Sequence, residues 1–282
     1  MRFLLGALAP FLLLTACGGG GGAAGLVQQP DPKLSRTLVW SDEFDGNGLP
    51  NATKWVYDTE RNRLGWYNNE LQYYSANRTE NAKVENGALT ITAIKERLST
   101  QADYGNQNYS SARLITKDKA SWTYGFFEVR AKLPCSLGTW PAIWMLGSGG
   151  RWPDDGEIDI MEQKGTSSAE KSRVNGTIHT RAYNYFNGSL GVGKGSSTSI
   201  SDACNNFHNY QLTWTSDKIA IGLDDQVYFE YTKPANATYQ EWPFDQPQFM
   251  ILNLAIGGDL GGAVPSNFTS DRMVVEYVRV YQ

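Results

Sequence analysis

The stretch that decides this fold is Trp152-Pro-Asp-Asp-Gly-Glu157-Ile-Asp159-Ile-Met-Glu162. Alternate side chains of a β-strand lie on the same face, so Glu157 and Asp159 point one way and the isoleucine between them points the other way. Glu162 has the wrong parity for a regular strand. One extra residue, a β-bulge at 160–161, would return Glu162 to the face of Glu157. The stretch therefore predicts a strand with an apolar side toward a core and three carboxylates on its other side.

Similar alternating runs recur from Thr37 to the end of the chain, broken by Gly, Asn, Asp and Pro, and clear examples are 88–93, 125–131, 210–214 and 274–281. Period-two patterning with β-branched and aromatic residues is typical of strands. The sequence has no convincing helical stripe longer than three turns and no repeat at a fixed period. Many short strands predict an all-β, antiparallel sandwich or barrel in one domain, residues 37–282. The Gly-, Ser- and Asn-rich residues 182–201 are expected to form a long surface loop.

The N-terminal segment has the features of an export signal followed by a tether. Residues 1–17 contain one arginine, an apolar run too short to span a bilayer comfortably, and Leu-Thr-Ala-Cys17 at their end. They resemble a bacterial lipoprotein signal, which implies cleavage before Cys17, lipidation of that residue and attachment to the cell envelope, at the outer membrane by our interpretation. An ordinary secretory signal with an incidental cysteine is the alternative. Residues 18–36 are Gly-rich at their start and predict a flexible tether.

The amino-acid composition indicates which kinds of molecule this protein binds. The net charge of −4 is spread along the chain without a block of Lys and Arg, so a nucleic-acid partner is not expected. The 9 Trp and 15 Tyr suit stacking against sugar rings, although large β cores also use many aromatics. In an exported protein the remaining cysteines, Cys135 and Cys204, predict a disulfide. Neither belongs to a CxxC or a Cys/His spacing that would indicate zinc.

The three carboxylates have a chemical interpretation and a structural one. Crowding makes it costly to ionise all of them together, so the pKa of at least one should rise. Two carboxyl groups with separated pKa values are what glycoside cleavage needs, one to attack the anomeric carbon and one to protonate the leaving oxygen. A solvated acidic face over a core is the structural alternative. The chemistry is favoured because Asp and Glu are poor strand formers and three tryptophans lie nearby.

Gly-Glu-Ile-Asp-Ile-Met-Glu at 156–162 resembles the active-site signature of glycoside hydrolase family 16, in its laminarinase-like form with the extra Met. The resemblance covers nearly the whole body of the chain and is specific because several motifs occur in order. These are Trp-Ser-Asp-Glu-Phe-Asp at 40–45, Asn-Asn-Glu-Leu-Gln-Tyr at 68–73, Ser-Ala-Arg at 111–113, Gly-Thr-Trp-Pro-Ala-Ile-Trp-Met-Leu at 138–146, Trp-Pro-Phe-Asp at 242–245, Leu-Asn-Leu-Ala-Ile-Gly-Gly at 252–258 and Tyr-Val-Arg-Val-Tyr at 277–281.

The resemblance implies a concanavalin-like jelly roll, a sandwich of two antiparallel sheets with a glucan cleft on its concave face. It implies retaining endo-hydrolysis of β-1,3-glucan, or of mixed β-1,3/1,4-glucan, with Glu157 as nucleophile, Glu162 as acid/base and Asp159 tuning the nucleophile. No cofactor is implied for catalysis, and we expect a monomer. The family's substrate contacts correspond here to Asn68, Arg113, Trp140, Trp144, Trp152 and His179.

Two further expectations come with this resemblance. Many family members bind a structural calcium on the convex side, which would here use Glu43, the backbone carbonyl of Gly87 and Glu276. The last of these departs from the family pattern, because Glu stands where Asp is usual and is one methylene longer. Other activities stay open, namely hydrolysis of agar, carrageenan or xyloglucan, or non-catalytic binding of β-glucan. The binding proteins lack the catalytic glutamates that this chain keeps.

Overall fold

The computed structural model describes residue 33 and residues 35–184 and 193–282. The chain divides into Met1–Pro30, which lies outside the described residues, and Asp31–Gln282, which forms one compact unit. The predicted signal, the predicted lipidation site Cys17 and most of the predicted tether therefore lie outside the described residues.

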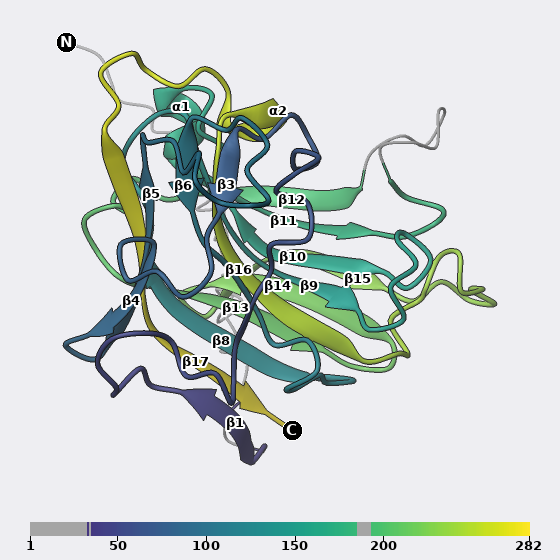
Figure 1. The fold of residues 1–282 in the computed structure, drawn as a ribbon. Coiled ribbons are helices and arrows are strands. Elements are labelled where there is room, and N and C mark those ends of the chain that lie inside the picture. Colours follow the sequence, from purple (N-terminus) through teal and green to yellow (C-terminus); the bar gives the residue numbers. More distant parts are fainter. Residues whose placement is uncertain (1–32, 34, 185–192) are drawn as a thin grey trace, which may run out of the picture. The chain divides into compact units, whose positions relative to one another are not determined.

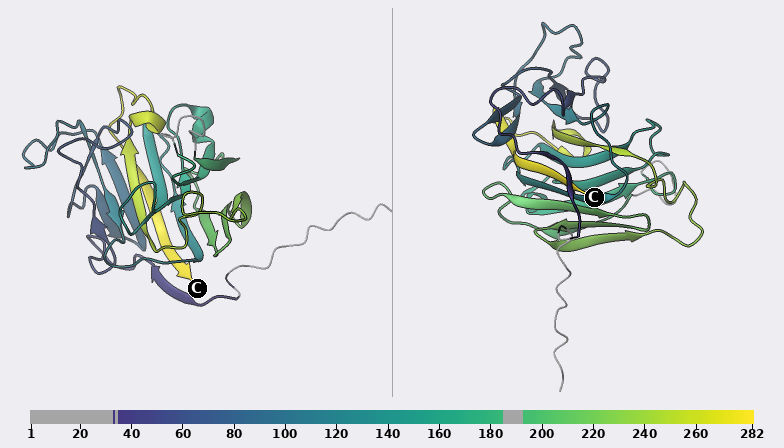
Figure 2. Two further views of the ribbon diagram at one scale, coloured as in Figure 1. Left: turned by 90° about the vertical axis from the view of Figure 1, so that its right-hand side faces the viewer. Right: turned by 90° about the horizontal axis from the view of Figure 1, so that it is seen from below.

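Two β-sheets make up the compact unit and lie as two layers (Figures 1 and 2). In order across the sheet, the seven-stranded sheet contains β12 (Lys194–Ser199), β11 (Arg173–His179), β10 (Glu157–Glu162), β9 (Thr139–Gly147), β16 (Gln248–Ile256), β7 (Arg113–Ile115) and β2 (Val56–Tyr57). The ten-stranded sheet contains β15 (Gln226–Thr232), β14 (Lys218–Leu223), β13 (His208–Trp214), β8 (Gly125–Lys132), β17 (Ser270–Tyr281), β5 (Ala88–Ile94), β6 (Tyr109–Ser111) and β3 (Gln72–Tyr74), with β1 (Leu38–Asp42) paired to β17 and β4 (Ala82–Glu85) paired to β5.

The sheets confirm the predicted all-β sandwich. Neighbouring strands are antiparallel, and the exception among the described residues is the short parallel pair β3–β6. Helix in the described part of the chain is confined to α1 (Ser168–Lys171) and α2 (Gly258–Gly261). Neither of these single turns has the length or the apolar character that crossing a bilayer requires, and no other described helix exists.

The core lies between the two sheets and is built by the alternation that the sequence shows. From β10 the fully buried Ile158 and Ile160 point inward, and from β8 the fully buried Phe127 and Val129 do the same. Burying an aliphatic or aromatic side chain of this size contributes about 1.5–3 kcal/mol, so each inward residue holds its strand in register. The outward face of each strand is then free to carry polar groups.

The strands predicted from alternation are all present, and each extends to or slightly beyond its expected bounds. The loop predicted for 182–201 is only partly correct. Lys194–Ser199 forms the edge strand β12, which pairs with β11 through its backbone. This strand has the sequence KGSSTS and buries no side chain fully, so no apolar alternation could reveal it. Residues 185–192 of the predicted loop lie outside the described residues.

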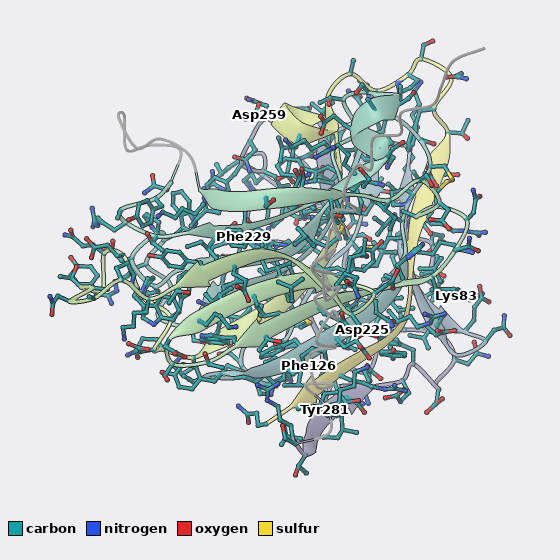
Figure 3. All side chains as sticks on the ribbon, turned by 180° about the vertical axis from the view of Figure 1, so that it is seen from behind. Lys83, Phe126, Asp225, Phe229, Asp259 and Tyr281 are labelled. Carbon is teal, nitrogen blue, oxygen red and sulfur yellow. A yellow bond between two sulfur atoms is a disulfide. The ribbon has the colours of Figure 1, made fainter. Side chains whose placement is uncertain are left out.

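The first described residue makes a buried ion pair. Lys33 Nζ lies 2.7 Å from Glu128 Oε2, and Gln211 and Tyr277 also donate hydrogen bonds to that fully buried carboxylate. The neighbours of Glu128 on β8, Phe127 and Val129, belong to the core, so Glu128 lies on the outer face of the ten-stranded sheet. Figure 3 views the molecule from the side on which this face lies. A carboxylate withdrawn from water is costly without a counter-charge, so the ammonium group of Lys33 stabilises the folded state here.

The predicted disulfide is present between Cys135 and Cys204, whose Cα atoms lie 5.1 Å apart. It joins the segment between β8 and β9 to the segment that precedes β13. The cysteines are 69 residues apart in sequence, so the bond removes a large share of the conformational freedom of the unfolded chain.

We expect the double substitution Cys135→Ala/Cys204→Ala to lower the free energy of unfolding by about 4 kcal/mol, the chain-entropy value for a loop of this length. The thermal midpoint should fall by about 10 °C. Calorimetry of the variant beside the oxidised wild type measures this difference. An unchanged midpoint would contradict a stabilising role for the bond.

Candidate active site

The bulge predicted in β10 is present and sets the geometry of the site. Asp159 lies opposite Trp144 of β9 and Glu162 lies opposite Ala142, so three steps along β10 match two along β9. The same shift appears against β11, where Asp159 faces Thr177 and Glu162 faces Asn175. The extra residue places both Ile160 and Met161 in the core, where they are fully buried. Glu157, Asp159 and Glu162 consequently share the outer face of the seven-stranded sheet.

Gly156, which immediately precedes β10, is required by its backbone conformation and by its neighbours. Its φ is +79°, a conformation that side-chain-bearing residues rarely adopt. A Cβ atom here would lie 2.9 Å from both Pro243 and Phe244, which cover the start of β10. The positive φ and the close approach of these residues therefore both require glycine here.

Each of the two candidate catalytic glutamates accepts a hydrogen bond from an indole. Trp140 Nε1 donates to Glu162 Oε1 over 2.9 Å, and Trp152 Nε1 donates to Glu157 Oε2. The rings differ in exposure, since Trp140 is buried and Trp152 is 43% exposed. An indole N–H can only donate, so these bonds favour carboxylate oxygens that accept.

Asp159 lies between the two glutamates and is almost completely buried. Burial, followed by the charges of Glu157 and Glu162, raises its pKa well above the usual range. Asp159 therefore keeps a proton under conditions that ionise an exposed aspartate, and it can donate that proton to the Glu157 carboxylate. His179 lies on the other side of Asp159, with Nε2 3.2 Å from Oδ2.

The pKa of Glu162 is also raised, chiefly by burial. The nearby charge of Glu157 adds to this effect, whereas His179, the Trp140 hydrogen bond and Lys164 lower the pKa. A carboxyl group that holds its proton at higher pH than usual is suited to donate it to a leaving oxygen. This direction agrees with the acid/base role predicted for Glu162.

The remaining predicted substrate contacts lie further along the same face. Arg113 of β7 stacks against Trp144 of β9, with 4.7 Å between the guanidinium carbon and the ring centroid, and pairs with Asp58 at 2.9 Å. Asn68 is exposed in the loop before β3, and its carbonyl accepts a hydrogen bond from the backbone N–H of Asp259. Asn68 is two residues from Trp66, whose ring centroid lies 5.1 Å from the guanidinium carbon of Arg113.

Several residues around the site were not predicted from the sequence. Trp66, Tyr74 and Asn253 surround Arg113 and Trp144. Tyr228 reaches the bulge from the opposite sheet, where its hydroxyl donates to the carbonyl of Ile160 over 3.5 Å. A signal existed for Asn253, which is one of only two amides in the otherwise apolar, fully buried run QFMILNLAI.

The residues predicted to hold calcium do not fit a cation in this arrangement. Both oxygens of Glu43 are occupied by Arg279, at 3.0 and 2.8 Å. Glu276 is paired with Arg130. Calcium binds oxygen ligands whose charge is available to it, and two guanidinium groups at these carboxylates oppose a third positive charge. Gly87 occupies the turn between β4 and β5 with φ +74°.

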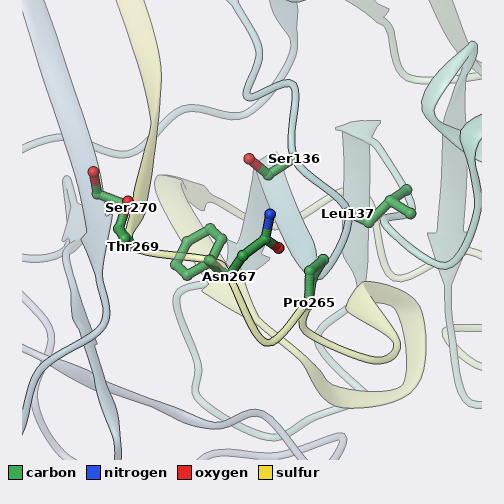
Figure 4. Close-up of a pocket in the computed structure, with 7 residues that line it drawn as sticks. Ser136, Leu137, Pro265, Asn267, Thr269 and Ser270 are labelled. Atoms are coloured by element: carbon green, nitrogen blue, oxygen red, sulfur yellow. The ribbon is translucent and has the colours of Figure 1, made fainter.

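A hollow of about 280 Å³ lies elsewhere on the molecule (Figure 4). The described residues that line it are Ser136, Leu137, Pro265 and 267–270, none of them on β10 or β11. It is therefore separate from the row of carboxylates.

Two glutamates on one short strand, each with a fixed hydrogen-bond donor, match the pair of carboxyl groups that glycoside hydrolases use. The sequence profile of the glycosyl hydrolases family 16 matches residues 69–279, and the chain belongs to this family. The resemblance seen in the sequence is thereby confirmed. Enzymes of this family need no cofactor for catalysis.

Relatives of known name agree with this assignment. A beta-glucanase of Rhodothermus marinus is 47% identical over 259 residues, which cover 87% of this chain and 85% of the relative. The X-ray structure of the laminarinase from Rhodothermus marinus superimposes with a TM-score of 0.79 at 46% identity, covering 88% of this chain and 97% of that one. The crystal structure of SCLam, a non-specific endo-beta-1,3(4)-glucanase, gives 0.83 at 51% identity, with 88% and 91% covered.

We expect Trp140→Phe to move the alkaline limb of the pH profile of kcat/KM to higher pH. The indole hydrogen bond stabilises the ionised form of Glu162, so its loss raises the pKa of that group and the proton is retained to higher pH. Initial rates across a pH series measure the limb. Trp144→Phe is the matched control, because its indole donates to Asn253 and not to the carboxylates. A limb that shifts equally in both variants, or in neither, would contradict the acid/base role of Glu162.

Proposed function

We propose that this chain cleaves β-1,3-glucan within the polymer, and mixed β-1,3/1,4-glucan as well, by a double displacement that retains the anomeric configuration. The observation that carries this proposal is the bulged strand β10, which sets Glu157, Asp159 and Glu162 side by side with an indole donor on each glutamate. Retaining glycosidases hold their two carboxyl groups about 5–5.5 Å apart. The names of the similar beta-glucanase, laminarinase and endo-beta-1,3(4)-glucanase support the substrate class.

The first step uses Glu157 and Glu162 in opposite protonation states. The Glu157 carboxylate attacks the anomeric carbon while the Glu162 carboxyl group gives its proton to the glycosidic oxygen, which leaves as a sugar hydroxyl. The Asp159 proton, donated toward Glu157, holds the attacking carboxylate in position. A covalent glycosyl ester on Glu157 and an ionised Glu162 result.

The second step restores both groups. The Glu162 carboxylate takes a proton from water as the water oxygen attacks the anomeric carbon, and the bond to Glu157 breaks. Two inversions at the same carbon give net retention. The Trp140 hydrogen bond stabilises Glu162 while it is ionised between the two steps.

Azide separates the two glutamate roles. With an activated aryl β-glucoside, Glu162→Ala should still form the glycosyl ester because a good leaving group needs no proton, and azide should then speed its release as the β-glycosyl azide. Glu157→Ala should be inactive on glucans, and azide can act there only from the vacant nucleophile side, giving the α-glycosyl azide. Proton NMR of the products distinguishes the anomers.

The opposite pair of products, β-azide from Glu157→Ala and α-azide from Glu162→Ala, would reverse the two assignments. With the unmodified enzyme on laminarin, the first product seen by NMR should be the β-anomer. Early α-anomer would end the double-displacement interpretation.

We also propose that the enzyme is a monomer attached to the bacterial cell envelope, at the outer membrane, through lipid on Cys17. The Leu-Thr-Ala-Cys17 sequence supports this proposal.

Cys17→Ser should move the protein from the membrane fraction to the soluble fraction with unchanged specific activity on laminarin. The reason is that the substitution removes the thiol that carries the lipid and leaves residues 37–282 intact. Fractionation followed by immunoblotting measures the change, and labelling with a radioactive fatty acid provides the control. Identical fractionation of the two proteins would reject the anchor.

A further inference from the structure

Five side chains from different segments form a closed ring beside the carboxylate row. The Trp144 indole N–H donates to Asn253 Oδ1 over 2.7 Å, and Asn253 Nδ2 donates to the Tyr74 hydroxyl over 3.0 Å. The Tyr74 ring packs edge-on against Trp66, with centroids 4.7 Å apart. Arg113 closes the ring, because its guanidinium lies 5.1 Å from the Trp66 centroid and 4.7 Å from the Trp144 centroid.

The direction of every hydrogen bond in this ring is determined by chemistry. The Trp144 indole can only donate, so the oxygen of the Asn253 amide must face it. The amide nitrogen then faces Tyr74, and the Tyr74 oxygen must accept. The Tyr74 proton is left to point toward Glu70, whose Oε2 lies 3.5 Å away. The amide has no second orientation that satisfies both neighbours.

Burial makes the Tyr74 hydroxyl irreplaceable by solvent. Tyr74 is fully buried and Asn253 is 5% exposed. A buried donor left without an acceptor is costly, so loss of the hydroxyl removes what holds the amide nitrogen of Asn253 in its present place. Flipping the amide would not supply a new acceptor, because its nitrogen would then face the indole N–H of Trp144, which is also a donor.

We propose that the Tyr74 hydroxyl is a positioning group for glucan binding, which acts through Asn253 to fix the Trp144 indole and the Arg113 guanidinium without touching the polysaccharide. This inference rests on the proposed glucanase function. Trp144 is only half-buried, so its exposed side is the part of the five-residue ring that can contact a sugar. Asp58 holds the guanidinium from beyond the ring, at 2.9 Å.

The test is Tyr74→Phe, which removes one oxygen atom and keeps the ring against Trp66. We expect KM for laminarin to rise about tenfold, equivalent to about 1.4 kcal/mol, with kcat within about twofold of the wild type. The pH profile should not move, because the described contacts of Tyr74 do not include the carboxylate row. The quenching of tryptophan fluorescence by a laminari-oligosaccharide should shift to higher concentration by the same factor.

Tyr73→Phe is the matched control. Tyr73 is also buried, and its hydroxyl donates a partly buried hydrogen bond to Asp103 Oδ1 over 2.7 Å, but it lies outside the ring. This variant should lose comparable stability and keep the wild-type KM. A KM that rises equally in both tyrosine variants, or in neither, would overturn the proposal.

Asn253→Leu carries the test if Tyr74→Phe does not fold. Leucine has a similar volume and suits the apolar strand β16. It removes the amide that links Tyr74 to Trp144, and so interrupts the same series of hydrogen bonds next to Trp144 itself. The same rise in KM is expected, and a wild-type KM would overturn the proposal. Failure of the proposed function is recognised separately, since the unmodified protein would then not hydrolyse laminarin at all.

Discussion

One additional residue in β10 is the constraint on which the site depends. Without the bulge, the alternation that buries Ile158 and Ile160 would send Glu162 into the core, where its charge would have no partner. With it, the apolar register of the sandwich and the row of carboxylates are satisfied together. The bulge is held from both sides, since β9 and β11 pair with β10 on either side of it and Tyr228 reaches its carbonyl from the other sheet.

The site is organised by hydrogen-bond donors that cannot also act as acceptors. Indole N–H groups meet Glu157, Glu162 and Asn253, and each can only donate. The three carboxyl groups differ instead in their surroundings. Asp159 is buried between the other two, and its proton stabilises the charge of Glu157. Fixed donors and graded burial let three similar side chains take different roles within one short strand.

Much of the fold and the carboxylate row could be predicted from the sequence, because both follow from period-two alternation. The bulge was predictable since Glu162 broke the parity that Glu157 and Asp159 set. The ring around Arg113 was not, because Tyr74 and Asn253 are 179 residues apart and meet only through the sheet order. β12 was missed because its strand character comes from backbone pairing with β11, and the position of Gly156 was explained only by the approach of Phe244.

The composition of β12 has a consequence for how copies of the enzyme behave at high density. Among the described strands of the seven-stranded sheet none lies beyond β12, so β12 forms an edge at which a second copy could add. Its side chains are those of Lys194 and a run of glycine, serine and threonine, with no large apolar group to bury. Edge-to-edge addition of a second copy would therefore gain backbone hydrogen bonds but almost no hydrophobic contact. Crowded molecules that share a long polymer can pass one another along it without fusing into a common sheet.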